Sequence, residues 1–186
     1  MDRLILFEDT RNKAGKHLNI EKSSLKYDVQ LVRKKLDAGD YMVPGVPVTI
    51  DTKQDLQEVY CNLVKEHDRF RRECIRAREM GLRLVILVEQ QGIRSVDDVK
   101  NWKNPRYADY ARRKLLGLSV PKAPPVSSER LANIMRTMSE NYGIEWRFCS
   151  KQNTFRTIIQ IIHEYGEKNN AEKTLQSDQG TEAAWR

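Results

Sequence analysis

The chain lacks long apolar runs, which excludes several classes of protein. No stretch reaches the roughly 18 consecutive apolar residues that a membrane-spanning helix needs. The apolar run at residues 4–7 is too short, and too closely followed by acidic residues, for a secretory signal peptide. We therefore expect a soluble protein with no membrane partner.

Cysteine and histidine are also scarce. The chain has three of each, and the cysteines at positions 61, 74 and 149 are far apart. An odd number of widely spaced cysteines suits neither a disulfide framework nor the short paired spacing of a zinc site. Reduced thiols are typical of the cytoplasm, so we expect a cytoplasmic protein.

Positive charge is what the chain has in excess. It carries 33 Lys and Arg residues against 26 Asp and Glu residues, a formal net charge of +7. Such an excess favours a polyanionic partner, because each phosphate that a cation neutralises releases counterions. A basic surface without a ligand explains the charge equally well, so the charge alone decides nothing.

The pattern of apolar residues predicts one domain over residues 1–166 and a polar, disordered tail over residues 167–186. Strand-like runs alternate with amphipathic helical repeats, which predicts an α/β fold with a mixed central sheet flanked by helices. The three strand-like segments between residues 29 and 50 predict an antiparallel meander with a turn at Pro44-Gly45. The predicted strands are 4–7, 29–33, 41–43, 46–50, 82–89 and 144–148, and the predicted helices are 54–64, 68–80, 95–99, 129–142 and 154–165.

Two acids and a lysine lie at the ends of the last predicted hairpin. Gly39-Asp40 precedes it, and Asp51-Thr52-Lys53 ends it. Alternate side chains of a strand share a face, so Asp51 and Lys53 point the same way, with Asp40 across from them if the hairpin closes. Carboxylates within about 4 to 6 Å repel unless a cation lies between them, and oxygen ligands favour Mg²⁺ or Mn²⁺. An isolated Asp-x-Lys is more often an exposed pair on an edge strand, but the preceding Gly-Asp turn and the helix that follows favour a metal site.

Four short motifs follow one another along the chain, and their order is informative. They are Glu8-Asp9-Thr10-Arg11, Gly39-Asp40, Asp51-Thr52-Lys53 and Arg69-Phe70. Together they resemble the signature of the XPF-type nuclease domain, a branch of the PD-(D/E)XK, restriction-endonuclease-like fold. That signature is V-D-x-R-E, then G-D, then E-R-K-x-x-x-D, then a helix that begins with arginine. The resemblance covers residues 3–165 and is nearest to the small stand-alone versions found in phage and prophage genomes.

The resemblance implies a metal-dependent endonuclease that hydrolyses phosphodiester bonds in branched, flapped or otherwise structured DNA. Asp40 and Asp51 would bind Mg²⁺ or Mn²⁺, with the backbone carbonyl of Thr52 as a third ligand. Lys53 would orient or activate the attacking water, and Asp9 would bind or position the water on the metal. The family setting also implies a bacterial or phage-infected host cell and allows a homodimer.

Three arginines complete the implied site. Arg11 would steady Asp9 or contact a phosphate, and Arg69 and Arg72 would bind the substrate from their helix. The family Glu-Arg-Lys reads Asp-Thr-Lys here, so Thr52 replaces an arginine that pairs with phosphate or carboxylate. We leave open whether one of the three arginines compensates for it.

Other departures from the family pattern leave alternatives open. The family's later acid falls at Gln57, so the neighbouring Glu58 is a candidate accessory acid. The helix-hairpin-helix domain of the larger family members is not present in this sequence. Loss of the Glu-Arg pair favours a second interpretation, a catalytically silent nuclease-like domain that binds DNA or a partner protein. An enzyme of the same fold that acts on RNA is a third.

Aromatic and basic residues are interleaved just before a proline-rich connector at residues 117–128. Trp102 and Tyr107 lie among six cations, a mixture that suits a nucleic-acid surface on which bases stack and phosphates are neutralised. A domain edge with Trp102 as a core anchor fits the pattern as well, and the sequence leaves both open. The cations are Lys100, Lys103, Arg106, Arg112, Arg113 and Lys114.

Overall fold

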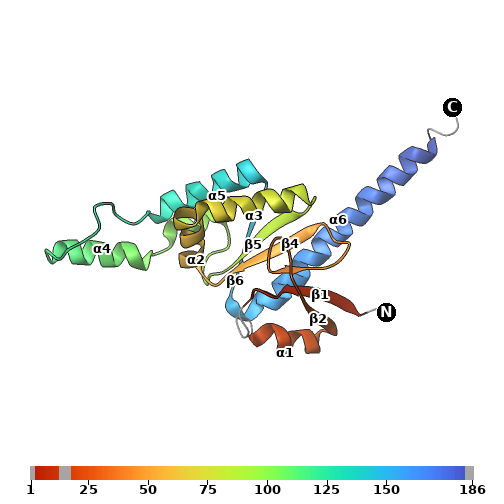
Figure 1. Ribbon diagram of the computed structural model, residues 1–186, viewed down its shortest axis with the longest axis horizontal. Helices are drawn as coiled ribbons and strands as arrows, with labels where there is room; N and C mark the ends of the chain where they lie inside the picture. Colours follow the sequence, from red (N-terminus) through yellow and green to blue (C-terminus); the bar gives the residue numbers. More distant parts are fainter. Residues whose placement is uncertain (1–2, 13–17, 183–186) are drawn as a thin grey trace.

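A central sheet lies between two layers of helices in the computed structural model, which describes residues 3–12 and 18–182 (Figure 1). The strands are β1 (Leu4–Asp9), β2 (Val29–Lys34), β3 (Tyr41–Met42), β4 (Val48–Lys53), β5 (Arg83–Glu89) and β6 (Glu145–Cys149). They form one six-stranded mixed sheet in the order β2-β1-β3-β4-β5-β6. This confirms the predicted α/β class with a mixed sheet.

Helices cover both faces of the sheet. The described helices are α1 (Leu18–Lys26), α2 (Leu56–Tyr60), the π-helical η1 (Cys61–Lys65), α3 (His67–Glu79), the 3₁₀ helix η2 (Val96–Asn101), α4 (Pro105–Leu115), α5 (Ser128–Tyr142), the 3₁₀ helix η3 (Lys151–Asn153) and α6 (Thr154–Glu182). One hydrophobic cluster packs α2, α3, α5 and η2 on one face, and a second packs α1 and α6 on the other. No helix in the described ranges is long and apolar enough to cross a membrane.

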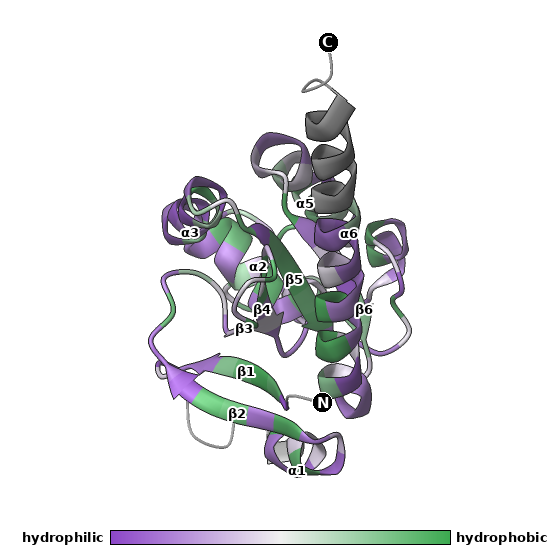
Figure 2. Ribbon diagram, turned by 90° about the vertical axis from the view of Figure 1, so that its right-hand side faces the viewer, coloured by the Kyte–Doolittle hydropathy of each residue, from purple (hydrophilic) through white to green (hydrophobic). Residues whose placement is uncertain are grey.

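The apolar run at residues 82–89 forms a strand as predicted, and residues 84–89 are all buried. β5 pairs in parallel with β4 on one side and β6 on the other. Its side chains alternate between the two clusters, with Leu84, Ile86 and Val88 in one and Val85 and Leu87 in the other. Figure 2 shows β5 as a hydrophobic strand in the middle of the molecule. A parallel strand covered on both faces has no polar side, which explains the continuous apolar run.

The expected meander is wrong in its first strand. β2 lies at the edge of the sheet and pairs in parallel with β1, rather than antiparallel with β3. The reason is α1, which connects β1 to β2, because a crossover through a helix returns the chain in the same direction. Residues 12–26 showed no clear period, so α1 was not predicted. The second half is correct, since β3 and β4 form an antiparallel hairpin in which Tyr41 lies opposite Ile50.

Element boundaries also differ from expectation at several places. α5 begins one residue earlier than predicted and is capped by Ser127, whose side chain accepts from the Arg130 backbone NH. α4 was not predicted at all. Ser95 and Asp98 form a capping box at the start of η2, and Gly143 ends α5 in the left-handed conformation.

The last helix is longer than the sequence pattern indicated. α6 continues to Glu182 and so includes most of the segment 167–186 for which we expected disorder. Its hydrophobic contacts to the sheet come from residues up to Tyr165, where the apolar period ends. Beyond that point nearly all residues are polar or glycine, so the segment carries no amphipathic signal.

Candidate active site

Three aspartates lie in one row across the sheet, near the ends of β1 and β4. Asp40 is in the middle: the Asp9 backbone NH donates to its carbonyl at 2.8 Å, and its own NH donates to the Ile50 carbonyl at 2.7 Å. The first bond continues the register of the β1–β3 pair by one residue. The second joins Asp40 to β4 at the residue before Asp51, whose pKa responds to the charge of Asp40. The sheet therefore gathers the three carboxylates that the sequence motifs predicted to meet.

The turn before Asp40 depends on a glycine. Gly39 has a φ of 73°, and a Cβ at this position would lie 2.3 Å from the Oγ1 atom of Thr49. That hydroxyl is held in place because it donates to the Ala38 carbonyl at 2.7 Å. Both the left-handed backbone and the missing side chain are thus required for the Gly-Asp motif to reach β4.

Asp51 and Lys53 form a buried ion pair. The Lys53 Nζ atom lies 2.5 Å from the Asp51 Oδ2 atom, and the two residues are 6% and 4% exposed. Burial raises the pKa of Asp51 to about 7, against the lowering effect of Lys53, and the charge of Asp40 adds to the rise. Burial lowers the pKa of Lys53, but the charges of Asp51 and Asp40 outweigh it and raise that pKa overall. The ammonium group of Lys53 therefore stays charged at neutral pH.

Thr52 fixes the carboxylate of Asp40. The Thr52 backbone NH donates to the Asp40 Oδ2 atom at 3.0 Å, and its hydroxyl donates to the same oxygen at 2.5 Å. Sequence reasoning considered only the backbone carbonyl of Thr52. Thr52, which replaces the family arginine, thus orients the Asp40 carboxylate through its hydroxyl.

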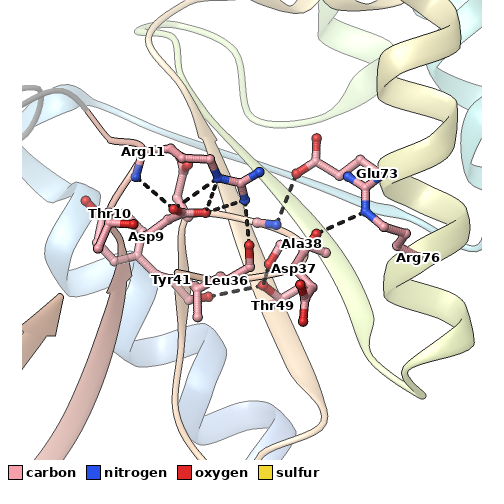
Figure 3. Close-up of polar contacts among 12 residues, drawn as sticks. Asp9, Thr10, Arg11, Leu36, Asp37, Ala38, Tyr41, Thr49, Glu73 and Arg76 are labelled. Carbon is pink, nitrogen blue, oxygen red and sulfur yellow. Dashed lines mark hydrogen bonds and ion pairs between the residues drawn. The ribbon is translucent and has the colours of Figure 1, made fainter. Parts of the chain in front are cut away.

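Arg11 holds the carboxylate of Asp9 (Figure 3). Its backbone NH donates to Asp9 Oδ1 at 2.8 Å, its Nε atom donates to Oδ2 at 2.9 Å, and its Nη2 atom contacts Oδ2 as well. The same Nη2 donates to the Leu36 carbonyl at 2.6 Å. Burial raises the pKa of Asp9, but the bonds from Arg11 outweigh it and the pKa is lowered. Asp9 is therefore ionised and oriented at neutral pH.

Glu73 is a member of the site that sequence reasoning missed. From α3, its Oε1 atom accepts a hydrogen bond from the Gly39 backbone NH at 3.0 Å (Figure 3). Its charge also raises the pKa of both Asp51 and Arg11, which places it within electrostatic reach of the row. The available signal was helical spacing, because Glu73 follows the motif residue Arg69 by four positions and so shares its face of the helix.

The remaining predicted residues lie outside the aspartate row. Glu58 accepts from the Gln54 backbone NH at 2.8 Å, so its carboxylate caps the start of α2, although its charge contributes to the raised pKa of Lys53. Arg69 is exposed and pairs with Glu66 at 2.7 Å. Arg72 is exposed on the same helix. The two arginines are directed to solvent rather than to the acids.

The chemistry of the site fits a hard divalent cation. The site brings together four carboxylates, those of Asp9, Asp40, Asp51 and Glu73. Arg11 and Lys53 supply two positive charges, so the site keeps a net negative charge that an added cation would neutralise. All the donor atoms are oxygens, which suits Mg²⁺ or Mn²⁺. Across residues 3–12 and 18–182, however, no three Asp, Glu, His or Cys side chains are arranged as a metal-binding group. The acids contact Thr52, Lys53 and Arg11 instead, so binding a metal would require at least one of these contacts to be exchanged.

Comparison with known proteins supports the fold. No protein-family model and no curated protein sequence matches the chain. Among solved structures, the fold is similar to that of XPF from Aeropyrum pernix, with a TM-score of 0.54 and 18% sequence identity. The similarity covers 85% of this chain and 64% of that chain, so this chain spans less than two thirds of the XPF chain. The protein therefore has an XPF-like fold of the restriction-endonuclease-like class.

Proposed function

We propose that this protein is a metal-dependent DNA endonuclease that hydrolyses phosphodiester bonds in branched, flapped or otherwise structured DNA. The observation that carries the proposal is the row of Asp9, Asp40 and Asp51 beside Lys53. Placed on an XPF-like fold, this set has the residue types that phosphodiester hydrolysis requires. Three of the four sequence motifs contribute side chains to this row. The fourth, the arginine at the start of α3, does not.

Asp40 and Asp51 would hold Mg²⁺ or Mn²⁺, together with the backbone carbonyl of Thr52. When bound, the ion would neutralise charge on the phosphate and make a nearby water more acidic. Because Lys53 stays protonated, we assign it to stabilising negative charge on the reacting phosphate rather than to removing a proton. Asp9, ionised and fixed by Arg11, would accept a hydrogen bond from the attacking water.

Exposed arginines would bring the nucleic acid to the row. The Arg11 side chain is more than half exposed although it holds Asp9, so it can contact a phosphate at the mouth of the site. Arg69 and Arg72 face solvent on α3, the helix that also carries Glu73. Contacts of this kind read the backbone and shape of DNA rather than its bases, which suits a structure-selective enzyme.

A specific observation favours a second candidate function. Asp51 and Lys53 are buried against each other, and the described residues hold no ready metal-binding group. Both features suit a catalytically silent nuclease-like domain that binds DNA or a protein. Mg²⁺ or Mn²⁺ that raises the melting temperature of the wild-type chain, but not of Asp51→Asn, would favour the enzyme over this alternative.

Cleavage of labelled substrates tests the proposal. The wild-type chain would be incubated with single-stranded, duplex, flap, fork and four-way-junction DNA, and with the matching RNAs, in Mg²⁺, Mn²⁺ or EDTA. We expect cutting that needs the metal and is strongest on one of the branched DNAs. Cutting of the RNAs alone would show that the substrate is RNA rather than DNA. Binding of DNA without cutting in either metal would favour the catalytically silent domain over the enzyme.

A further inference from the structure

A basic arm projects from the body of the protein. We define it as residues 100–122, which comprise the end of η2, α4 and the start of the connector to α5. Figure 1 shows α4 reaching away from the sheet and the other helices. None of the side chains of α4 is buried. A helix without a buried face gains little stability from packing against its own chain, which suits a helix that binds a partner.

Most of the net charge of the protein lies on this arm. It contains seven Lys and Arg residues and one acid, Asp109, so it accounts for a net charge of +6 out of the +7 of the whole chain. All seven cations are exposed. Such a local concentration of charge creates a strongly attractive field for a polyanion. The cations are Lys100, Lys103, Arg106, Arg112, Arg113, Lys114 and Lys122.

The base of the arm is fixed to α2, the helix that follows the strand carrying Asp51 and Lys53. Asn104 is buried, accepts from the Gln57 side chain at 2.9 Å and donates to the Val126 carbonyl at 3.0 Å. Gln57 follows Lys53 by four residues, at the start of α2. Trp102 packs against the first hydrophobic cluster, which agrees with the alternative in which it anchors a domain edge to the core. The arm therefore starts at a defined place relative to the site.

The far end of the arm exposes apolar side chains. Leu115 is 87% exposed, and Leu116 and Leu118 are also mostly exposed. Three exposed leucines within four positions form an apolar tip, which is costly in water unless a partner covers it. In proteins that bend or open DNA, apolar side chains on a basic element pack against unstacked bases.

We propose that the basic arm binds the nucleic-acid backbone beside the candidate active site, and that its leucine tip packs on bases exposed at a junction or fork. The eleven residues of α4 span about 16 Å, which is the length of about five phosphates along one strand. The net charge of +6 favours a nucleic acid over a protein as the occupant. This inference rests on the proposed function and adds to it the surface that selects branched DNA.

Binding measurements test the charge of the arm. The full chain carrying Lys53→Ala would be titrated into labelled fork DNA without divalent metal, at several salt concentrations. We expect Arg112→Ala/Arg113→Ala/Lys114→Ala to weaken binding about tenfold or more and to lower the salt slope by about 2 to 3. The matched control is Lys22→Ala/Lys26→Ala/Lys168→Ala, which removes three exposed cations outside the arm and should change the affinity only slightly. Equal losses in the two triple variants would overturn the proposal.

The leucine tip makes a separate prediction. Leu115→Ser/Leu116→Ser should reduce the preference for fork over plain duplex DNA severalfold while leaving the duplex affinity nearly unchanged. A concentration-dependent dimer that this variant abolishes, with unchanged preference for fork DNA, would assign the tip to a second copy of the chain and overturn its role on bases. The two proposals fail separately: binding through the arm without cutting would refute only the nuclease, and cutting that the arm variants leave intact would refute only the arm.

Discussion

The carboxylates of Asp40 and Asp51 lie within electrostatic reach of each other at the open end of the β3–β4 hairpin, and the next two residues of β4 supply a partner for each acid. Thr52 donates twice to the Asp40 carboxylate, and Lys53 pairs with Asp51 at 2.5 Å. Two carboxylates in adjacent strands would otherwise repel each other. The Asp-Thr-Lys sequence thus supplies an acid and also the partners that keep both acids in place.

The Gly-Asp turn should be intolerant of any side chain at Gly39. Gly39→Ala adds a Cβ in a left-handed conformation and against the Thr49 hydroxyl. We expect a loss of about 3 kcal/mol in the free energy of unfolding, measured with urea. Gly45→Ala is a matched control, because Gly45 also has a positive φ (82°) but a Cβ there meets nothing within 4 Å. It should cost about 1 to 2 kcal/mol, and equal losses in the two variants would show that the close approach to Thr49 is unimportant.

Glu73 should act through its hydrogen bond to the Gly39 backbone. Glu73→Ala leaves this buried NH without its acceptor and should cost about 1 to 3 kcal/mol in the free energy of unfolding. Glu73→Gln keeps an acceptor oxygen at the same reach, so its stability should stay within about 1 kcal/mol of the wild type. Urea unfolding of the three proteins compares them directly. If the glutamine variant loses as much as the alanine variant, the charge of Glu73 rather than its hydrogen bond stabilises the turn.

The buried carboxylate of Asp51 should make the stability of the metal-free protein depend on pH. Burial raises its pKa from 3.8 to about 7 in the folded chain, so between these values the folded state holds a proton that the unfolded state has lost. The free energy of unfolding should therefore fall as the pH rises from about 4 to about 7. The asparagine in Asp51→Asn does not titrate, so the free energy of unfolding of this variant should decrease less over the same pH range. Urea unfolding in EDTA at several pH values measures the difference, and parallel pH curves for the two proteins would contradict it.

The hairpin and the aspartates could be predicted from the sequence because they depend on local rules. A Pro-Gly turn between two apolar runs fixes the β3–β4 pairing, and strand alternation then decides which residues share a face. Once Tyr41 lies opposite Ile50, Asp40 and Asp51 both lie at the open end of the hairpin. The buried run of β5 was equally readable, because a covered parallel strand has no polar side.

The parts that sequence reasoning missed depend on contacts between distant segments. Helical spacing places Glu73 on the face of Arg69, but its contact with Gly39 exists only because α3 lies beside the turn before β3, 34 residues away in the sequence. The parallel placement of β2 depends on α1, whose sequence has little amphipathic signal. Arg69 matched the family motif by position, yet its side chain pairs with Glu66 at the surface.

The central claim is that the Asp51–Lys53 pair serves metal-dependent hydrolysis, and single-turnover cleavage of one branched DNA tests it most directly. Wild type, Asp51→Asn, Lys53→Ala and the surface control Lys22→Ala would be compared on a labelled flap in Mg²⁺ and in EDTA. Our account predicts cutting by the wild type and Lys22→Ala in Mg²⁺, none in EDTA, and a loss of at least about a hundredfold in both site variants. Cutting that persists in Lys53→Ala and Asp51→Asn, or no cutting by the wild type on any branched DNA, would contradict it.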